Sequence, residues 1–150
     1  MKEIEKSRSI TFVIDSRLEN VSFIGVAVRG ICNYLSLNEM NAYHIELCLV
    51  EAVTNAIQHA YQLEPGHDVE VNLLSTGNSV TLQICDKGEP TDVRGEACAF
   101  AFEPERPQAV PERGMGLFLI HKLMDEVSYE QVGNKNILSL KKYLIEEECS

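Results

Sequence analysis

The stretch E-L-C-L-V-E-A-V-T-N-A-I-Q-H-A-Y, residues 46–61, determines how the rest of the chain can be arranged. It contains no Gly or Pro, and its composition suits the interior of a helix. Apolar side chains occupy almost every side of that helix, which predicts burial. One polar line interrupts them, because Glu51, Asn55 and His59 are spaced four residues apart and project from one face. A buried carboxylate or amide destabilises a fold unless it has partners, so this line predicts a specific binding site.

Composition limits the class of protein. The 150 residues suit a single domain, 1–150, and 45% hydrophobic with 24% charged residues is typical of a globular protein. A net charge of −10 without a basic cluster argues against nucleic-acid binding. No secretion signal or membrane-spanning stretch is present, so we expect a cytoplasmic protein without a membrane anchor. The odd set of cysteines is expected to be reduced: Cys32, Cys48, Cys85, Cys98 and Cys149.

The order of predicted elements indicates the fold. In sequence they are a strand at 9–15, a helix at 21–36, a helix opened by a capping box at 36–39 and ending before Pro65, a hairpin of strands 69–75 and 80–86, a helix ending near 126, and strands 127–132 and 136–144. This order predicts an α+β fold, a two-layer α/β sandwich with a mixed, mostly antiparallel sheet and helices on one face. The proline-containing segment at about 89–113 has no periodicity and is interpreted as a lid.

Two strands carry a polar residue at the end of an apolar row. Asp86 follows Val80, Leu82 and Ile84 on one face of its strand. Asn136 likewise shares a face with Leu138 and Leu140. Taken alone, Asp86 is better explained as a turn residue at a strand end, so neither position alone identifies a site.

Two glycines, Gly114 and Gly116, enter the helix that follows the lid. Free N–H groups and the helix dipole at such a position favour an anion, although a tight turn also explains a G-x-G pattern. The other candidates have structural alternatives too. Glu51 and Asn55 can be a hydrogen-bonded pair that supports the core, His59 a satisfied histidine at a helix end, and Arg113 a solvated loop residue.

The combination of these features is more informative than each alone. Asn55 offers an oxygen ligand that suits Mg²⁺, and the glycine backbone can hold phosphates. Asp86 can accept a hydrogen bond from an exocyclic amine such as that of adenine. Glu51 can act as a base. These groups fit ATP with Mg²⁺.

At these residues the chain resembles the GHKL (Bergerat-fold) ATPases. E-A-V-T-N-A-I-Q-H-A-Y is similar to their N-box in the form found in bacterial anti-sigma-factor serine kinases. D-K-G at 86–88 resembles the start of the G1 box, and R-G-M-G-L at 113–117 resembles the G2 box. The G1 box departs from the family pattern, since Glu89 and Pro90 follow Gly88 where a second Gly is usual.

The resemblance implies a role for each matched residue. It implies that Glu51 is the general base, that Asn55 is the Mg²⁺ ligand, that Asp86 binds the adenine amino group and that Gly88 lets the base approach. The remaining nucleotide-binding residues implied by the family are Arg113, Gly114, Met115, Gly116, Leu117 and Asn136, with the two glycines at the phosphates and Asn136 on the adenine side.

The resemblance also implies a biological role. It indicates an anti-sigma factor that is also a serine-protein kinase, which uses ATP and Mg²⁺ to phosphorylate an anti-sigma-factor antagonist and otherwise sequesters a sigma factor. A homodimer is also expected. The alternative is an ATP-gated protein-binding switch without significant kinase activity.

Overall fold

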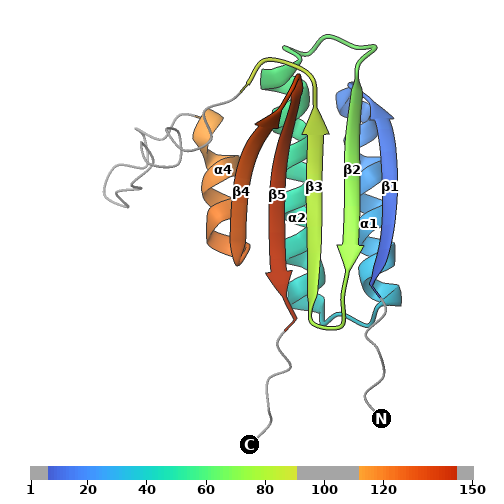
Figure 1. The fold of residues 1–150 in the computed structure, drawn as a ribbon. Coiled ribbons are helices and arrows are strands. Elements are labelled where there is room, and N and C mark those ends of the chain that lie inside the picture. Colours follow the sequence, from blue (N-terminus) through green and yellow to red (C-terminus); the bar gives the residue numbers. More distant parts are fainter. Residues whose placement is uncertain (1–6, 91–111, 145–150) are drawn as a thin grey trace, which may run out of the picture.

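A computed structural model describes residues 7–90 and 112–144, with the side chains of 112–115 excepted. In these residues one sheet is covered on one face by helices, as Figure 1 shows. The strands are β1 (Arg8–Asp15), β2 (Asp68–Ser75), β3 (Ser79–Asp86), β4 (Glu126–Val132) and β5 (Lys135–Tyr143). The helices are α1 (Val21–Tyr34), α2 (Glu39–Asn55) and α4 (Glu112–Leu123), with a 3₁₀ turn at Leu18–Asn20 and a π-helical turn at Ala56–Ala60. The expected two-layer α+β fold is confirmed.

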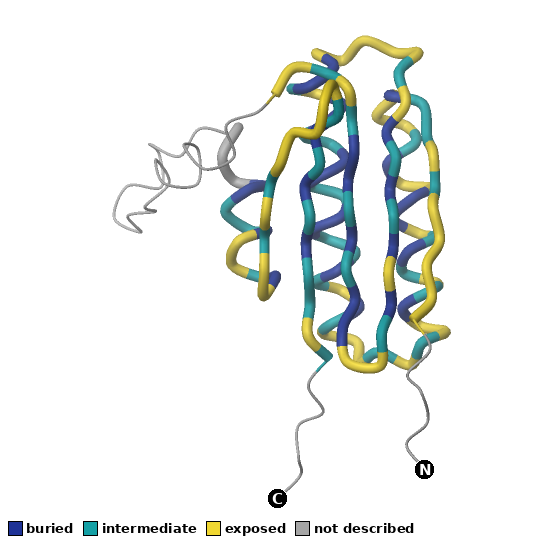
Figure 2. The backbone as a smooth tube through the Cα atoms, viewed as in Figure 1, coloured by how far each residue is buried: buried dark blue, intermediate teal, exposed yellow. Residues whose placement is uncertain are grey.

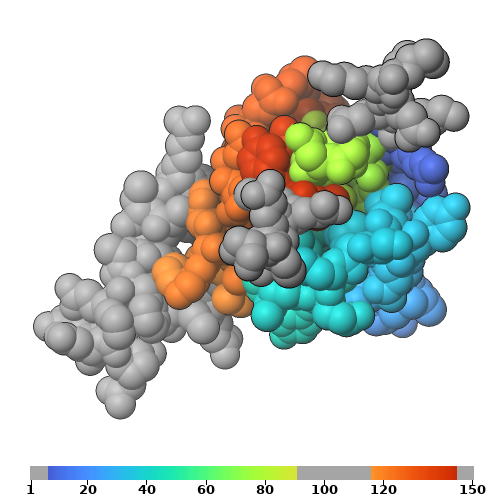
Figure 3. Space-filling view, turned by 90° about the horizontal axis from the view of Figure 1, so that it is seen from below, coloured from blue at the N-terminus to red at the C-terminus, as the bar shows by residue number. Residues whose placement is uncertain are grey.

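The sheet has the strand order β1-β2-β3-β5-β4, and all four pairings are antiparallel. The prediction of a mixed sheet was therefore wrong in this respect, because β5 returns from its hairpin with β4 to pair directly with β3. This pairing sets Asp86 opposite Asn136. Both residues lie at the end of the sheet that is uppermost in Figure 1, whereas Figure 3 looks onto the opposite end, where the β2–β3 turn lies.

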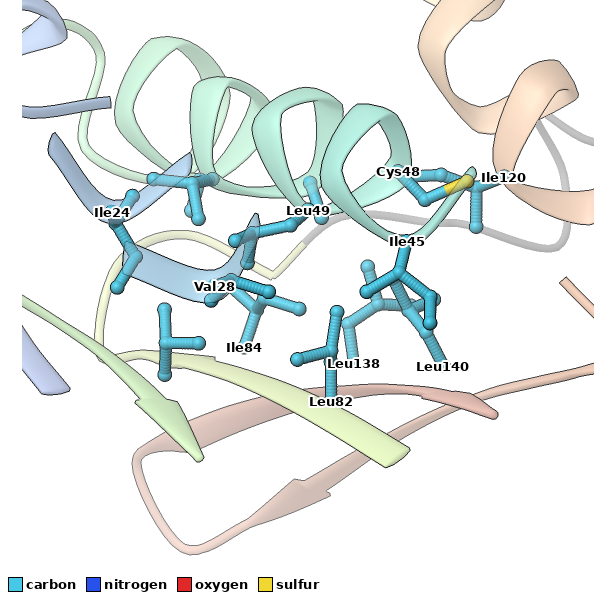
Figure 4. Packing of buried hydrophobic residues seen from close by; sticks show 14 of the residues in the cluster. Ile24, Val28, Ile45, Cys48, Leu49, Leu82, Ile84, Ile120, Leu138 and Leu140 are labelled. Atoms are coloured by element: carbon cyan, nitrogen blue, oxygen red, sulfur yellow. The ribbon is translucent and has the colours of Figure 1, made fainter. Parts of the chain in front are cut away.

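The core lies between the sheet and the helix layer. In Figure 4, Ile45 and Leu49 of α2 project toward Leu82 of β3 and Leu140 of β5, and all four side chains are fully buried. Each such side chain stabilises the fold by about 1.5–3 kcal/mol when removed from water. Figure 2 shows that burial concentrates in α2 and the central strands, and that exposure increases at β1 and β4. The strongly apolar helix predicted from the sequence is thus the centre of the helix layer.

Two predicted helix boundaries differ from the structure. Asn38, and not Ser36, caps α2, since its side chain accepts a hydrogen bond from the Asn41 N–H at 2.7 Å. Ser36 adopts a left-handed conformation with φ 61° in the connection from α1. Helix α4 ends at Leu123 and not near 126. The Met124 N–H still bonds to the Ile120 carbonyl at 3.0 Å, but the Asp125 N–H already bonds to the Lys141 carbonyl of the sheet at 2.9 Å.

The end of α2 departs from α-helical geometry. Tyr61 N–H bonds to the Ala56 carbonyl at 3.0 Å across the π-helical turn. A π turn holds more residues than an α turn, so the spacing of four residues from Asn55 to His59 does not have its α-helical geometry. That all three residues share one face stays a prediction for His59.

The described cysteines Cys32, Cys48 and Cys85 are free and buried. Burial raises the pKa of each thiol to about 11. Cys98 and Cys149 lie outside the described residues. Among the helices that the structure describes, none is long and apolar enough to cross a membrane.

Candidate functional site

The first cluster of the site joins α2 to α4. Glu51 and Asn55 are half-buried on α2, and Gly116 of α4 lies directly against them. A Cβ atom at Gly116 would lie 2.6 Å from Glu51 Oε2 and 3.3 Å from Asn55 Nδ2. Any larger residue at this position would require the Glu51 carboxylate to move, so glycine lets the α4 backbone approach these two side chains closely. The structure thus brings together three residues that the sequence placed in one site.

Asn55 has an unused hydrogen-bonding group. Its Nδ2 atom is buried and has no hydrogen-bond partner in the described part of the chain. Buried polar atoms are nearly always paired, so an unpaired one indicates a group that a ligand can satisfy. Its position beside Glu51 and Gly116 makes this face of α2 the candidate phosphate and metal side of the site.

The second cluster lies where β3 ends. Asp86 Oδ1 accepts hydrogen bonds from the Gly88 N–H at 3.0 Å and from Asn136 Nδ2 at 2.8 Å. Asn136 Nδ2 also donates to the Gly88 carbonyl at 3.0 Å, so both hydrogens of this amide are used inside the protein. Asn136 therefore contributes to the site by orienting Asp86.

The sequence did not predict one member of this cluster, Gln131. Its Nε2 donates to Asn136 Oδ1 at 3.1 Å from the directly opposite position on β4. The sequence clue to Gln131 is the hairpin around Gly133, because a hairpin centred there pairs residue 131 with residue 136.

The electrostatics of Asp86 suit a buried hydrogen-bond acceptor. Burial raises the pKa of its carboxyl above the ordinary value, while the hydrogen bonds from Asn136 and Gly88 favour the ionised form and oppose that rise. Within the described residues no hydrogen bond engages its second oxygen, Oδ2. That oxygen is available to accept a hydrogen bond from a ligand.

Both clusters lie toward the C-terminal end of the helix formed by α2 and the π-helical turn. Gly88 packs against Ala60, and a Cβ at Gly88 would collide with the Ala60 carbonyl oxygen. This contact gives a structural reason for glycine at position 88, in addition to the expected approach of a base. The neighbouring Glu89 is exposed and its N–H bonds to the Ala60 carbonyl at 2.8 Å, so the acid that replaces the usual second glycine is on the surface.

The other predicted site residues are placed as follows. Arg113, Gly114 and Met115 lie in the first turn of α4, so the G2 glycines are part of the helix and do not precede it. The side chains of Arg113 and Met115 are outside the described structure. Leu117 is buried in the hydrophobic core, which leaves only its backbone for a ligand. The predicted lid lies almost wholly in residues 91–111, outside the described residues.

A pocket of about 330 Å³ lies behind Asp86, on the face of the sheet without helices. Cys85 and Lys135 line it together with Glu70, whose Oε2 accepts a hydrogen bond from Lys135 Nζ at 2.8 Å. This pocket is separate from the cluster of Glu51 and Asn55. In the described residues no group of three His, Cys, Asp or Glu side chains could hold a metal ion.

Comparison with known proteins agrees with this geometry. The model of the histidine kinase-like ATPase domain matches residues 14–142, and the chain belongs to this family. The serine-protein kinase RsbW of Oceanobacillus iheyensis is 27% identical over 141 residues, which cover 93% of this chain and 89% of that protein. The serine-protein kinase RsbW of Bacillus licheniformis is 28% identical over 131 residues, with coverage of 86% and 81%.

A solved structure shares the fold. It is described as the SiaB-SiaC complex from Pseudomonas aeruginosa, and the matching chain has a TM-score of 0.58, 16% identity and 88% coverage of both chains. The resemblance inferred from the N-box and the glycine motif is thereby confirmed, and ATP binding is the shared property of the domain.

Proposed function

We propose that this protein is a serine-protein kinase and anti-sigma factor. It transfers the γ-phosphate of ATP to a serine of an anti-sigma-factor antagonist, and it sequesters a sigma factor when the antagonist is phosphorylated or scarce. The similarity to serine-protein kinases RsbW supports kinase activity, and the SiaB-SiaC crystal structure contains this fold in a protein complex. We further propose that the protein is a cytoplasmic homodimer that binds neither nucleic acid nor membranes.

The location of both clusters toward the C-terminal end of the same helix is the observation that supports this proposal. One cluster presents Glu51 and the unpaired amide of Asn55 beside the α4 backbone. The other presents the available Oδ2 of Asp86 where β3 ends. A carboxylate for a base, an oxygen ligand and an acceptor for an amine are what ATP-dependent phosphoryl transfer requires from such a fold.

In the proposed phosphate-transfer step, Glu51 accepts the proton of the serine hydroxyl. The serine oxygen forms a bond to the γ-phosphorus, while the bond from that phosphorus to the oxygen bridging the β-phosphate breaks and ADP leaves. Glu51 accepts the hydroxyl proton, late in a loose transition state. Asp86, oriented by Asn136, and the α4 backbone hold the nucleotide in position for this attack.

The donor set fits Mg²⁺ only together with a nucleotide. Asn55 is the single amide at the cluster, and no cage of acidic side chains is present in the described residues. Mg²⁺ in phosphate-transfer sites is usually held by one or two protein oxygens plus the phosphates. When bound, Mg²⁺ neutralises negative charge on the β- and γ-phosphates, and Asn55 would supply its protein ligand.

The proposed function is tested by incubating the protein with γ-labelled ATP, Mg²⁺ and an antagonist-type protein encoded beside its gene. We expect label on a serine of the antagonist. Binding of both ATP and the antagonist without transfer of label would favour the ATP-gated switch. Absence of ATP binding, measured by thermal shift, would contradict both functions, because a ligand that binds only the folded state must stabilise it.

A further inference from the structure

Residues 86–89, which connect the adenine-side carboxylate to the lid, are held by the end of α2. Three consecutive N–H groups are engaged: that of Lys87 by the Tyr61 hydroxyl at 2.8 Å, that of Gly88 by Asp86 Oδ1 at 3.0 Å, and that of Glu89 by the Ala60 carbonyl at 2.8 Å. Two of these three acceptors come from the π-helical turn and the residue after it. The direction of the Asp86 side chain is therefore coupled to the geometry of that turn.

Tyr61 occupies the centre of this arrangement. It is 7% exposed, and its hydroxyl both accepts from Lys87 N–H and donates to the Asp68 carbonyl at 2.7 Å. One oxygen thus connects the end of β3 to the start of β2. The Tyr61 ring stacks on His67 with a centroid distance of 4.6 Å and an interplanar angle of 8°, which fixes the direction of the hydroxyl.

The local backbone is irregular at the position that makes these contacts. The π-helical turn is followed by two non-glycine residues with positive φ, Gln62 at 52° and Leu63 at 64°. π turns and left-handed non-glycine residues are disfavoured and persist where the surroundings hold them in place. Here they bring the Ala60 carbonyl and the Tyr61 hydroxyl to the β3 end. Ser16 holds the segment that follows the turn. Its hydroxyl, in a residue that is 1% exposed, donates to the Glu64 carbonyl and accepts from the His67 N–H.

We propose that Tyr61 is a positioning residue that sets adenine recognition through residues 86–89. This inference rests on the proposed function, in which Asp86 binds the exocyclic amine of ATP. Tyr61 does not touch the nucleotide in this proposal. Its hydroxyl holds the Lys87 N–H and so keeps Asp86 Oδ2 in position to accept a hydrogen bond from the amino group of adenine. Guanine has a carbonyl at the same position, which a carboxylate oxygen disfavours.

The test compares Tyr61→Phe with Tyr34→Phe, which removes the same hydroxyl from an exposed position on α1. Titration calorimetry with Mg-ATP and Mg-GTP gives the preference for adenine over guanine for each protein. In Tyr61→Phe we expect the preference to fall about tenfold, mainly through weaker ATP binding, as for a lost hydrogen bond in a buried network. Amide exchange at Lys87, followed by NMR, should become faster in the same variant. Tyr34→Phe should match the wild-type protein in both measurements.

A purely structural role for Tyr61 would give a different result. It would lower the melting temperature while leaving the ratio of ATP to GTP affinity within about twofold of wild type, and that outcome would overturn the inference. If Tyr61→Phe does not fold, replacing the Lys87 N–H by an ester oxygen removes the same hydrogen bond from the other side, with the same expected and contrary results. A wild-type protein that fails to bind ATP, or to prefer it to GTP, would refute the proposed function itself and is thus distinguishable.

Discussion

The two sides of the candidate site differ in how complete they are. On the adenine side, Asp86 and Asn136 are joined by a hydrogen bond of 2.8 Å, and Gly88 bonds to both of them. On the phosphate side, Glu51 and Asn55 lie against the α4 backbone, and the buried Nδ2 of Asn55 is unpaired within the described residues.

This difference assigns nucleotide recognition to the side of Asp86 and phosphate transfer to the side of Glu51. A hydrogen-bonded network loses little entropy when a ligand binds, so the adenine side is preorganised. On the proposed phosphate side, the buried Nδ2 donor of Asn55 is unpaired within the described residues, so a phosphate oxygen of a nucleotide can accept its hydrogen bond. Variants on the phosphate side should therefore affect catalysis and metal dependence, whereas variants on the adenine side should affect both stability and nucleotide preference.

The largest effect is expected for Glu51→Ala. Loss of a general base should lower the rate of phosphate transfer to the antagonist by about 10²- to 10⁴-fold. Binding of ATP should change little, since the adenine side is intact. Single-turnover transfer and calorimetric ATP affinity, measured side by side, check this. Transfer by the variant at a rate close to wild type would refute the role of Glu51 as base.

Asn55→Ala should separate the metal from the nucleotide. We expect ATP affinity in the presence of Mg²⁺ to fall roughly tenfold or more, because the proposed protein ligand of the metal is removed. Affinity in EDTA should match that of the wild-type protein. An unchanged affinity with Mg²⁺ present would count against the ligand assignment.

Asn136→Ala should weaken the adenine side and the fold together. It leaves the buried Asp86 carboxylate with one donor fewer, which should lower the free energy of unfolding by about 1–3 kcal/mol. Urea unfolding measures this loss. Ser139→Ala, a half-buried polar residue on the opposite face of the same strand, is the matched control and should cost less. Equal losses in the two variants would argue against a special role for the network.

The smallest effect concerns pH. Burial raises the pKa of Asp86 in the folded protein, so the folded state binds this proton more tightly than the unfolded state does. The carboxylate therefore costs stability at neutral pH, and this cost declines as pH falls from the folded-state pKa to the unfolded-state pKa. ATP affinity should change in the opposite direction and weaken over the pH range around the folded-state pKa, which lies above that of an ordinary Asp. Asp86→Asn should bind ATP weakly and without this pH dependence; a wild-type affinity that stays constant over the range would contradict the assignment.

Strand alternation predicted part of the site well. The apolar rows ending in Asp86 and beginning with Asn136 were visible in the sequence, because a core-facing strand residue must alternate with surface residues. That the two residues pair could not be predicted, since pairing of β3 with β5 depends on how the β4–β5 hairpin returns to the sheet. The role of Gln131 follows from the same pairing.

Helical periodicity was less reliable at the end of α2. It correctly placed Glu51 and Asn55 on one face, but the π-helical turn that begins at Ala56 has a different period, so α-helical spacing does not extend to His59. Tyr61 was seen only as the last residue of a helical stretch. Its hydrogen bonds join three segments that are distant in sequence, which no local pattern records.

The buried thiols described above also provide a chemical way to measure how often the native protein unfolds. Cys32 and Cys48 lie in the hydrophobic core, and a thiol with a pKa of about 11 holds almost no reactive thiolate at neutral pH. Alkylating reagents can therefore reach these two sulfurs only while the chain is open. In a variant that lacks Cys98, Cys149 and the pocket-lining Cys85, the speed of alkylation would report how often the native protein opens, and its slowing by ATP would measure the energy that the nucleotide adds to the fold.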